Sequence, residues 1–139
     1  MSNFEEKAVD RIKKLEREVE RLRVKESPGA WLAWTATKSA QWTETGTVTW
    51  TTRYTKIGKI VTVSVWCFAV GGSIALSSLG YITLPFAVST TGSGTGVVVT
   101  GLGVQLGVAM AYKNTSNLYF STFSAMSNEF FLTLTYEAA

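Results

Sequence analysis

The sequence has 139 residues and a formal net charge of +3, and its charged side chains are concentrated at one end. Of its 23 Lys, Arg, Asp and Glu residues, 15 lie within positions 1–26. The remainder has no basic stripe and no apolar run of about 18 residues, so we expect neither nucleic-acid binding nor a membrane-spanning helix. The charged N-terminus also predicts no signal peptide.

Residues 4–26 are predicted to form a helix, because they lack Gly and Pro and are rich in Glu, Lys, Arg and Leu. Apolar side chains recur at the spacing of a coiled-coil seam: Ile12, Leu15, Val19 and Leu22. Pairs of opposite charge flank this seam, as a parallel in-register assembly of identical chains requires: Arg11 with Glu16, and Glu18 with Arg23. The alternative is an amphipathic helix that packs on its own head.

The helix is predicted to end at the Ser-Pro-Gly sequence of residues 27–29, since Pro disfavours a helical residue before it. This break divides the chain into a stalk at 1–26, a neck with a first strand at 27–41, and a head at 42–139. The composition changes at the same place, because every Trp, every Thr and all but one Gly lie beyond it.

The head is predicted to be mainly β, an antiparallel β-sandwich of jelly-roll type with eight or nine strands. Alternation over residues 47–54 leads into a tight turn at 56–59 and a long strand at 60–70. A loop rich in Gly, Ser and Thr is expected at 89–96. Further strands are predicted at 82–85, 97–100, 104–112, 118–126 and 130–136.

The strand at 60–70 is apolar on both faces, with Val61, Val63 and Val65 on one side and Trp66 and Phe68 on the other. One face packs in the core, and the other needs a cover that a partner chain would supply. We therefore expect a homo-oligomer in which Trp66 and Phe68 join the helical seam as contact residues. The seam alone favours a dimer, a preference that a large head interface can override. The single Cys67 is expected to be a buried apolar side chain.

The residue inventory indicates a protein that is not an enzyme. The chain has no His, so Ser-His and Cys-His nucleophile pairs are excluded. Three Glu are the only acidic residues of the head: Glu44, Glu129 and Glu137. A carboxylate pair across a subunit interface is the weaker alternative. We expect no catalytic residue, no metal site and no cofactor.

Three short segments resemble the C-terminal head domains of bacteriophage tail-fibre and minor structural proteins. They are residues 53–63 (RYTKIGKIVTV), 82–86 (ITLPF) and 130–136 (FFLTLTY), and together they extend the resemblance over about residues 42–137. The resemblance implies a trimeric β-sandwich head at the distal end of a fibre on the virion. It also implies binding to a receptor on the host surface, often a glycan, and contact with other tail proteins. It supplies no catalytic motif.

Ligand contacts are expected in the hairpin of residues 112–119, which combines aromatic and amide side chains: Tyr112, Asn114, Asn117 and Tyr119. Asn-rich turns also form for backbone reasons alone. The loop at 89–96 is the second candidate. The tryptophans that follow the stalk are expected to pack between subunits at the shoulder of the head: Trp31, Trp34, Trp42 and Trp50.

Three functions compete on this basis. The first is a receptor-binding fibre tip that attaches a phage to its host. The second is a trimeric structural cap or decoration protein of a virion, which would recognise other virion proteins. The third is a trimeric TNF/C1q-like signalling head, which the missing signal peptide and disulfides disfavour.

Overall fold

A computed structural model describes residues 3–25 and 30–139, and the side chains of 21–25 are not among those it describes. The chain forms two compact units, Met1–Ala30 and Trp31–Ala139. The predicted break at 27–29 lies outside the described residues. From Trp31 onward the predicted neck belongs to the second unit, where its first strand joins the main sheet.

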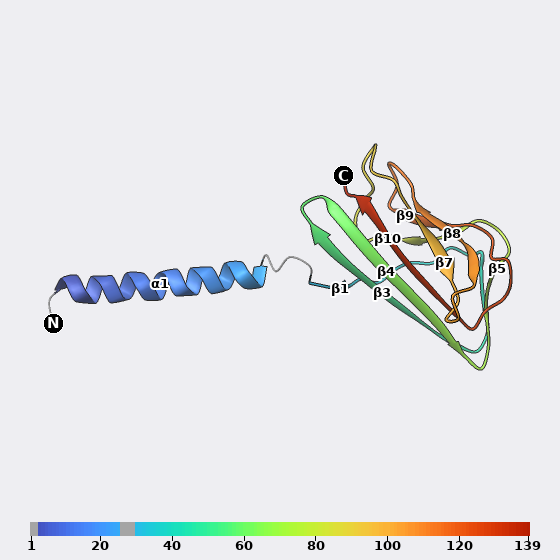
Figure 1. Cartoon of the computed structure of the whole chain (residues 1–139), viewed down its shortest axis with the longest axis horizontal. Coiled ribbons are helices and arrows are strands. Elements are labelled where there is room, and N and C mark those ends of the chain that lie inside the picture. The colour runs from blue at the N-terminus through green and yellow to red at the C-terminus, as the bar shows by residue number, and fades with distance from the viewer. Residues whose placement is uncertain (1–2, 26–29) are drawn as a thin grey trace. The chain divides into compact units, whose positions relative to one another are not determined.

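The predicted helix is confirmed as α1 (Asn3–Lys25), which carries Glu5 and Glu6 in its first turn (Figure 1). Acidic side chains at this end stabilise the helix by interacting with its dipole. Ile12, Leu15 and Val19 are 56, 60 and 53 % exposed, so the apolar stripe is uncovered. The side chain of Leu22 lies outside the described part. No described helix is long and apolar enough to cross a membrane.

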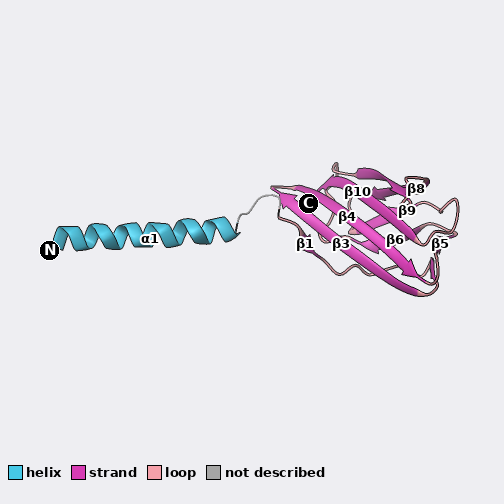
Figure 2. Ribbon diagram, turned by 60° about the horizontal axis from the view of Figure 1, so that its bottom comes forward, coloured by secondary structure: helices cyan, strands magenta, loops and turns pink. Residues whose placement is uncertain are grey.

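The described part of the second unit contains ten strands: β1 (Leu32–Ala33), β2 (Trp42–Glu44), β3 (Thr47–Ile57), β4 (Ile60–Val70), β5 (Ile74–Leu76), β6 (Gly80–Thr83), β7 (Gly94–Val99), β8 (Gln105–Ala111), β9 (Asn117–Phe120) and β10 (Glu129–Glu137). Eight of them form one curled antiparallel sheet in the order β1-β3-β4-β10-β7-β8-β9-β6, and β2 pairs with β5 (Figures 1 and 2). The head is therefore mainly β and consistent with a sandwich-like fold, as predicted.

The long hairpin of β3 and β4 confirms the sequence pattern most closely. Ile57 pairs with Ile60 next to the turn, and Gly58 adopts a φ of +60°, a left-handed conformation that glycine adopts without strain. Val61, Val63 and Val65 of β4 are buried, while Trp66 lies on the opposite face. A strand with period-two alternation thus separates its core and outer faces as expected.

Two predicted boundaries are wrong. The expected loop at 89–96 ends earlier, because Gly94 and Gly96 belong to β7. Glycine is needed there, since a Cβ atom on Gly94 would overlap the carbonyl oxygen of Thr135 on β10. The expected strand at 118–126 ends at Phe120, and the chain then turns so that the Phe123 amide donates to the carbonyl of Leu76 in β5 at 2.9 Å.

We expect Gly94→Ala to lower the free energy of unfolding, because the added methyl group must displace the backbone of β10. Overpacking of this kind costs about 1–3 kcal/mol. The control is Gly103→Ala, at a φ of +82° with open space around it, which tests backbone strain alone. Urea denaturation measures both variants, and an unchanged stability of Gly94→Ala would show that β7 and β10 are not packed so closely.

Aromatic side chains fill the core between β2, β3, β9 and β10. Trp42 stacks on Phe130 with centroids 5.9 Å apart, and Trp50 meets Phe130 edge-on at 5.4 Å. Trp34 also packs against the core, and its indole N–H donates to the carbonyl oxygen of Thr83 at 3.0 Å. The shoulder role predicted for these tryptophans is therefore corrected, since Trp34, Trp42 and Trp50 pack within their own chain. Trp31 is exposed.

Cys67 is buried in this core, as predicted. Burial, with a smaller contribution from the Glu44 carboxylate, raises the pKa of the Cys67 thiol from 9.0 to about 12. The thiol is then protonated and unreactive at neutral pH.

We expect the free energy of unfolding to fall as the pH rises above 9. The unfolded chain releases the thiol proton near its ordinary pKa of 9.0, whereas the folded chain keeps it up to about pH 12. Burial likewise raises the pKa of Tyr136 from 10.0 to about 12, with the same sign. Denaturation at pH 8 and 10.5 tests this, and Cys67→Ala should lessen the loss. Rapid reaction of the native thiol with a disulfide reagent at pH 8 would contradict the assignment.

Candidate functional site

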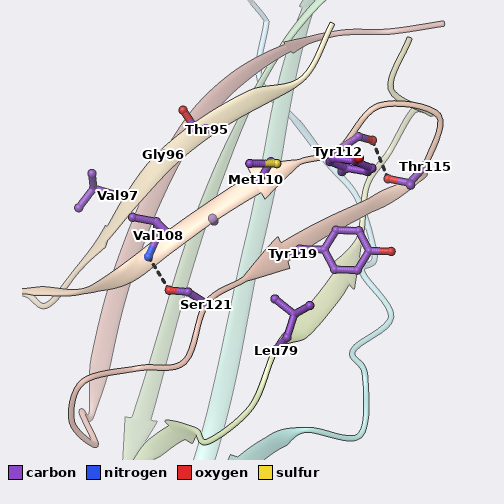
Figure 3. Close-up of a pocket in the computed structure, with 11 residues that line it drawn as sticks. Leu79, Thr95, Gly96, Val97, Val108, Met110, Tyr112, Thr115, Tyr119 and Ser121 are labelled. Atoms are coloured by element: carbon purple, nitrogen blue, oxygen red, sulfur yellow. Dashed lines mark hydrogen bonds between the residues drawn. The ribbon is translucent and has the colours of Figure 1, made fainter. Parts of the chain in front are cut away.

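A groove of about 780 Å³ lies on the outer face of β7, β8 and β9 (Figure 3). The strand register explains its floor. Thr95 of β7 pairs with Met110 of β8, and Met110 pairs in turn with Tyr119 of β9. Because side chains on directly paired residues point to the same face, these three form one row across the sheet.

A second row lies beside the first. Val97 pairs with Val108, and the Ser121 hydroxyl accepts a hydrogen bond from the Val108 amide at 2.9 Å. Val97 and Val108 are 50 and 48 % exposed, so two branched apolar side chains face outward side by side. Leu79 lies across the groove, beside Tyr119 (Figure 3).

The hairpin after β8 closes one end of the groove. Tyr112 and Thr115 line it, and the Thr115 hydroxyl donates to the Tyr112 carbonyl oxygen at 2.7 Å. Asn114 adopts a φ of +60°, which asparagine tolerates better than most residues. Hydrogen bonds within the turn thus hold its backbone, and this backbone fixes the position of Tyr112.

Two of the four predicted ligand residues, Tyr112 and Tyr119, line this groove together. Asn114 and Asn117 are not among its lining residues. Asn117 contributes indirectly, because its side-chain amide donates to the Tyr119 hydroxyl at 3.3 Å. The ring of Tyr119 also meets Tyr81 edge-on at 5.8 Å. Asn114 and Asn117 therefore shape and hold the site.

The second predicted ligand site was the loop at 89–96, and only the part of it that belongs to β7 lines the groove. Thr95 and Gly96 line the groove, while the Ser89 amide is bound to the carbonyl of Glu137 at 2.9 Å. Near the hairpin, Ser93 accepts a hydrogen bond from the amide of Lys113 at 3.0 Å. Most of the segment 89–96 therefore holds neighbouring segments in place and does not line the groove.

Sequence reasoning missed the apolar part of the groove, Val97, Val108 and Met110. A signal was present in residues 108–112, where large side chains alternate with Ala109 and Ala111. The small alanines are the buried ones, and Met110 and Tyr112 are exposed. A strand that buries its small residues and exposes its large ones indicates a contact surface.

The predicted contact residues Trp66 and Phe68 lie on the outer face of β4. Trp66 is 42 % exposed, and it stacks on Phe131 of β10 with centroids 6.0 Å apart and rings 5° from parallel. The Trp66 indole N–H donates to the Glu129 carboxylate at 2.8 Å. We name Trp66, Phe68 and Phe131 the outer aromatic patch. Their role in subunit contact stays a prediction.

A smaller pocket of about 180 Å³ opens beside Trp34 and Trp50. The charged group in its lining, the Lys38 ammonium, already has a partner. It donates to one carboxylate oxygen of Glu44 at 2.7 Å, and the Trp50 indole N–H donates to the same oxygen at 2.7 Å. In residues 3–25 and 30–139, no group of three or more His, Cys, Asp or Glu side chains is placed to hold a metal ion. The groove is therefore the leading candidate site.

Comparison of the chain with protein-family models, curated proteins and solved structures finds no match.

Proposed function

We propose that this chain is the receptor-binding tip of a bacteriophage tail fibre, which attaches the virion to a glycan on the bacterial surface. The observation that carries the proposal is the outer groove. It brings Tyr112 and Tyr119 together with the hydroxyl groups of Thr95 and Ser121 along β7, β8 and β9. Aromatic faces pack against the C–H surface of sugars, and hydroxyl groups exchange hydrogen bonds with them.

In this proposal the head is a jelly-roll-type β-sandwich and the chain is a homotrimer, joined by a parallel coiled coil of its α1 helices. Two uncovered surfaces support self-association: the helical stripe around Leu15 and the outer aromatic patch around Trp66. Neighbouring exposed apolar side chains on a small protein indicate a contact site. Other tail proteins of the virion would be further partners.

Self-association would also strengthen binding to a surface glycan. A shallow groove on one head binds one sugar segment weakly, but linked sites act together. Linking binding modules raises the overall affinity by about 10²- to 10⁴-fold when the sites can be engaged at once. A trimeric tip therefore holds a repetitive surface polymer much more tightly than one head alone.

The test is adsorption of the fluorescently labelled full chain to a panel of bacterial strains. We expect some strains to bind it, and we expect Tyr119→Ala to weaken that binding about tenfold or more, as loss of a central aromatic contact does. Leu102→Ala is the control, because Leu102 is an apolar residue that is 95 % exposed and does not line the groove.

Failure to adsorb to any strain would contradict the proposed function. Adsorption that Tyr119→Ala leaves unchanged would contradict the assignment of the groove. Binding to purified virion proteins in the absence of adsorption to cells would instead identify a structural cap or decoration protein.

A further inference from the structure

The chemistry of the groove goes further than glycan binding in general. Resting on the proposed function, we propose that the groove selects neutral N-acetylated sugars and rejects anionic polymers such as those with phosphate in their backbone. Three observations on the described residues carry this inference: the charge of the lining, its apolar wall and the hydrogen bonds its hydroxyl groups already make.

The described lining residues of the groove carry no formal charge. The nearest cation in sequence is Lys113, which follows Tyr112 but does not line the groove. Phosphate and carboxylate groups are recognised chiefly by Arg and Lys side chains, and burying such a group without a partner is costly. An anionic segment would therefore lose hydration in this groove and gain no cationic partner in return.

The wall of the groove is apolar where Val97, Val108 and Met110 face outward together (Figure 3). A sugar that presents only hydroxyl groups would leave them facing this wall without partners, at a cost in free energy. The methyl of an acetamido group would instead bury apolar surface against it. The wall thus favours a sugar that carries a methyl group.

The hydroxyl groups at the side of the wall are suited to the rest of the acetamido group. The Ser121 hydroxyl accepts from the Val108 amide at 2.9 Å, and the Tyr119 hydroxyl accepts from the Asn117 amide at 3.3 Å. Each keeps its own proton to donate. Donors beside an apolar wall match a carbonyl oxygen next to a methyl group, which is the acetamido arrangement.

The size of the groove is compatible with more than one sugar ring. Its volume of about 780 Å³ lies within the range of roughly 300–1,000 Å³ that is usual for small-ligand sites. An oligosaccharide is therefore a better probe than a single sugar.

Titration calorimetry of the full chain tests the inference with defined probes. These are tetramers of N-acetylglucosamine and of N-acetylgalactosamine, the matching glucose and galactose tetramers, and poly(glycerol phosphate). We expect one acetylated tetramer to bind about tenfold or more tightly than its non-acetylated counterpart, since one extra methyl-sized group in a pocket gives roughly 10- to 200-fold discrimination. We expect no binding of the phosphate polymer.

Three variants identify the groups responsible. Val108→Thr keeps the side-chain shape and should reduce the preference for the acetylated tetramer. Tyr119→Phe keeps the ring but removes a donor, and should weaken binding of the acetylated tetramer. Lys113→Ala is the control and should change neither, because its side chain lies outside the lining.

Equal binding of acetylated and non-acetylated tetramers, binding of none of the tetramers, or tighter binding of poly(glycerol phosphate) would overturn the inference. If the chain still adsorbs to bacteria in that case, the proposed function stands and only the ligand class is wrong. If Tyr119→Phe changes the mass of the assembly but not sugar binding, the groove is a subunit contact and the inference is also overturned.

Discussion

Replacing Phe130 by alanine is expected to lower the free energy of unfolding by about 3–5 kcal/mol, the usual effect of removing a large buried aromatic side chain. Phe130 is fully buried, and it contacts Trp50 and Phe123 with ring centroids 5.4 and 5.3 Å away. The cavity would be lined by rigid rings, which cannot collapse into it. Urea denaturation followed by tryptophan fluorescence measures the change.

The next residue in the chain is the matched control. Phe131 has the same side chain on the opposite face of β10, and it is 37 % exposed. Phe131→Ala should lower the stability of the isolated chain much less than Phe130→Ala does, and it should weaken self-association. Equal loss of stability in the two variants at a concentration that keeps the chain dissociated would show that the two faces of β10 are not core and surface.

Replacing Leu15 by serine is expected to dissociate the proposed homotrimer at micromolar concentration. Leu15 is 60 % exposed in the single chain, so its burial in a seam would contribute about 1.5–3 kcal/mol for each chain. A seam of about three heptads is marginal by itself, because helix formation has a costly nucleus. Sedimentation velocity over a range of concentrations measures the loss.

Arg17→Ser is the control for this variant. Arg17 occupies the position farthest from the seam in the heptad that contains Leu15, and serine there changes helix propensity by a similar amount. Its mass in solution should match that of the unmodified chain. Unchanged mass for both variants would show that the helical stripe is not an interface.

Local sequence patterns predicted those elements whose structure does not depend on neighbouring strands. The bounds of β4 follow from strict alternation between the Gly58 turn and Gly71, and α1 follows from composition and spacing. Gly94 and Gly96 were assigned to a loop because glycine usually marks one. Their place in β7 depends on how closely β10 approaches, which no local pattern records.

Half of the candidate site could be predicted from the sequence, for a similar reason. Tyr112 and Tyr119 flank one turn, so their proximity follows from the hairpin alone. The pairing of Val97 with Val108 depends on the register of β7 against β8, and that register shifts at an irregularity between Val98 and Val99. Sequence reasoning had no means to place this shift, so it could not assemble the apolar wall.

The outer aromatic patch and the groove share one face of the curled sheet. Phe131 of β10 pairs with Val99 of β7, and Val97, two residues away on the same strand, already lines the groove. A subunit contact at Phe131 would therefore lie next to a bound sugar. Variants of Phe131 and Tyr119 should be compared in both mass and binding measurements, since residues in contact or sharing a partner are not independent.

The claim on which the fibre-tip proposal depends most directly is that the chain self-associates. Light scattering coupled to size-exclusion chromatography measures the mass of the full chain without any choice of host or ligand. We expect the mass of a homotrimer, three times the chain mass of 15.1 kDa, or about 45 kDa. A mass of 15.1 kDa across the accessible concentrations would contradict it.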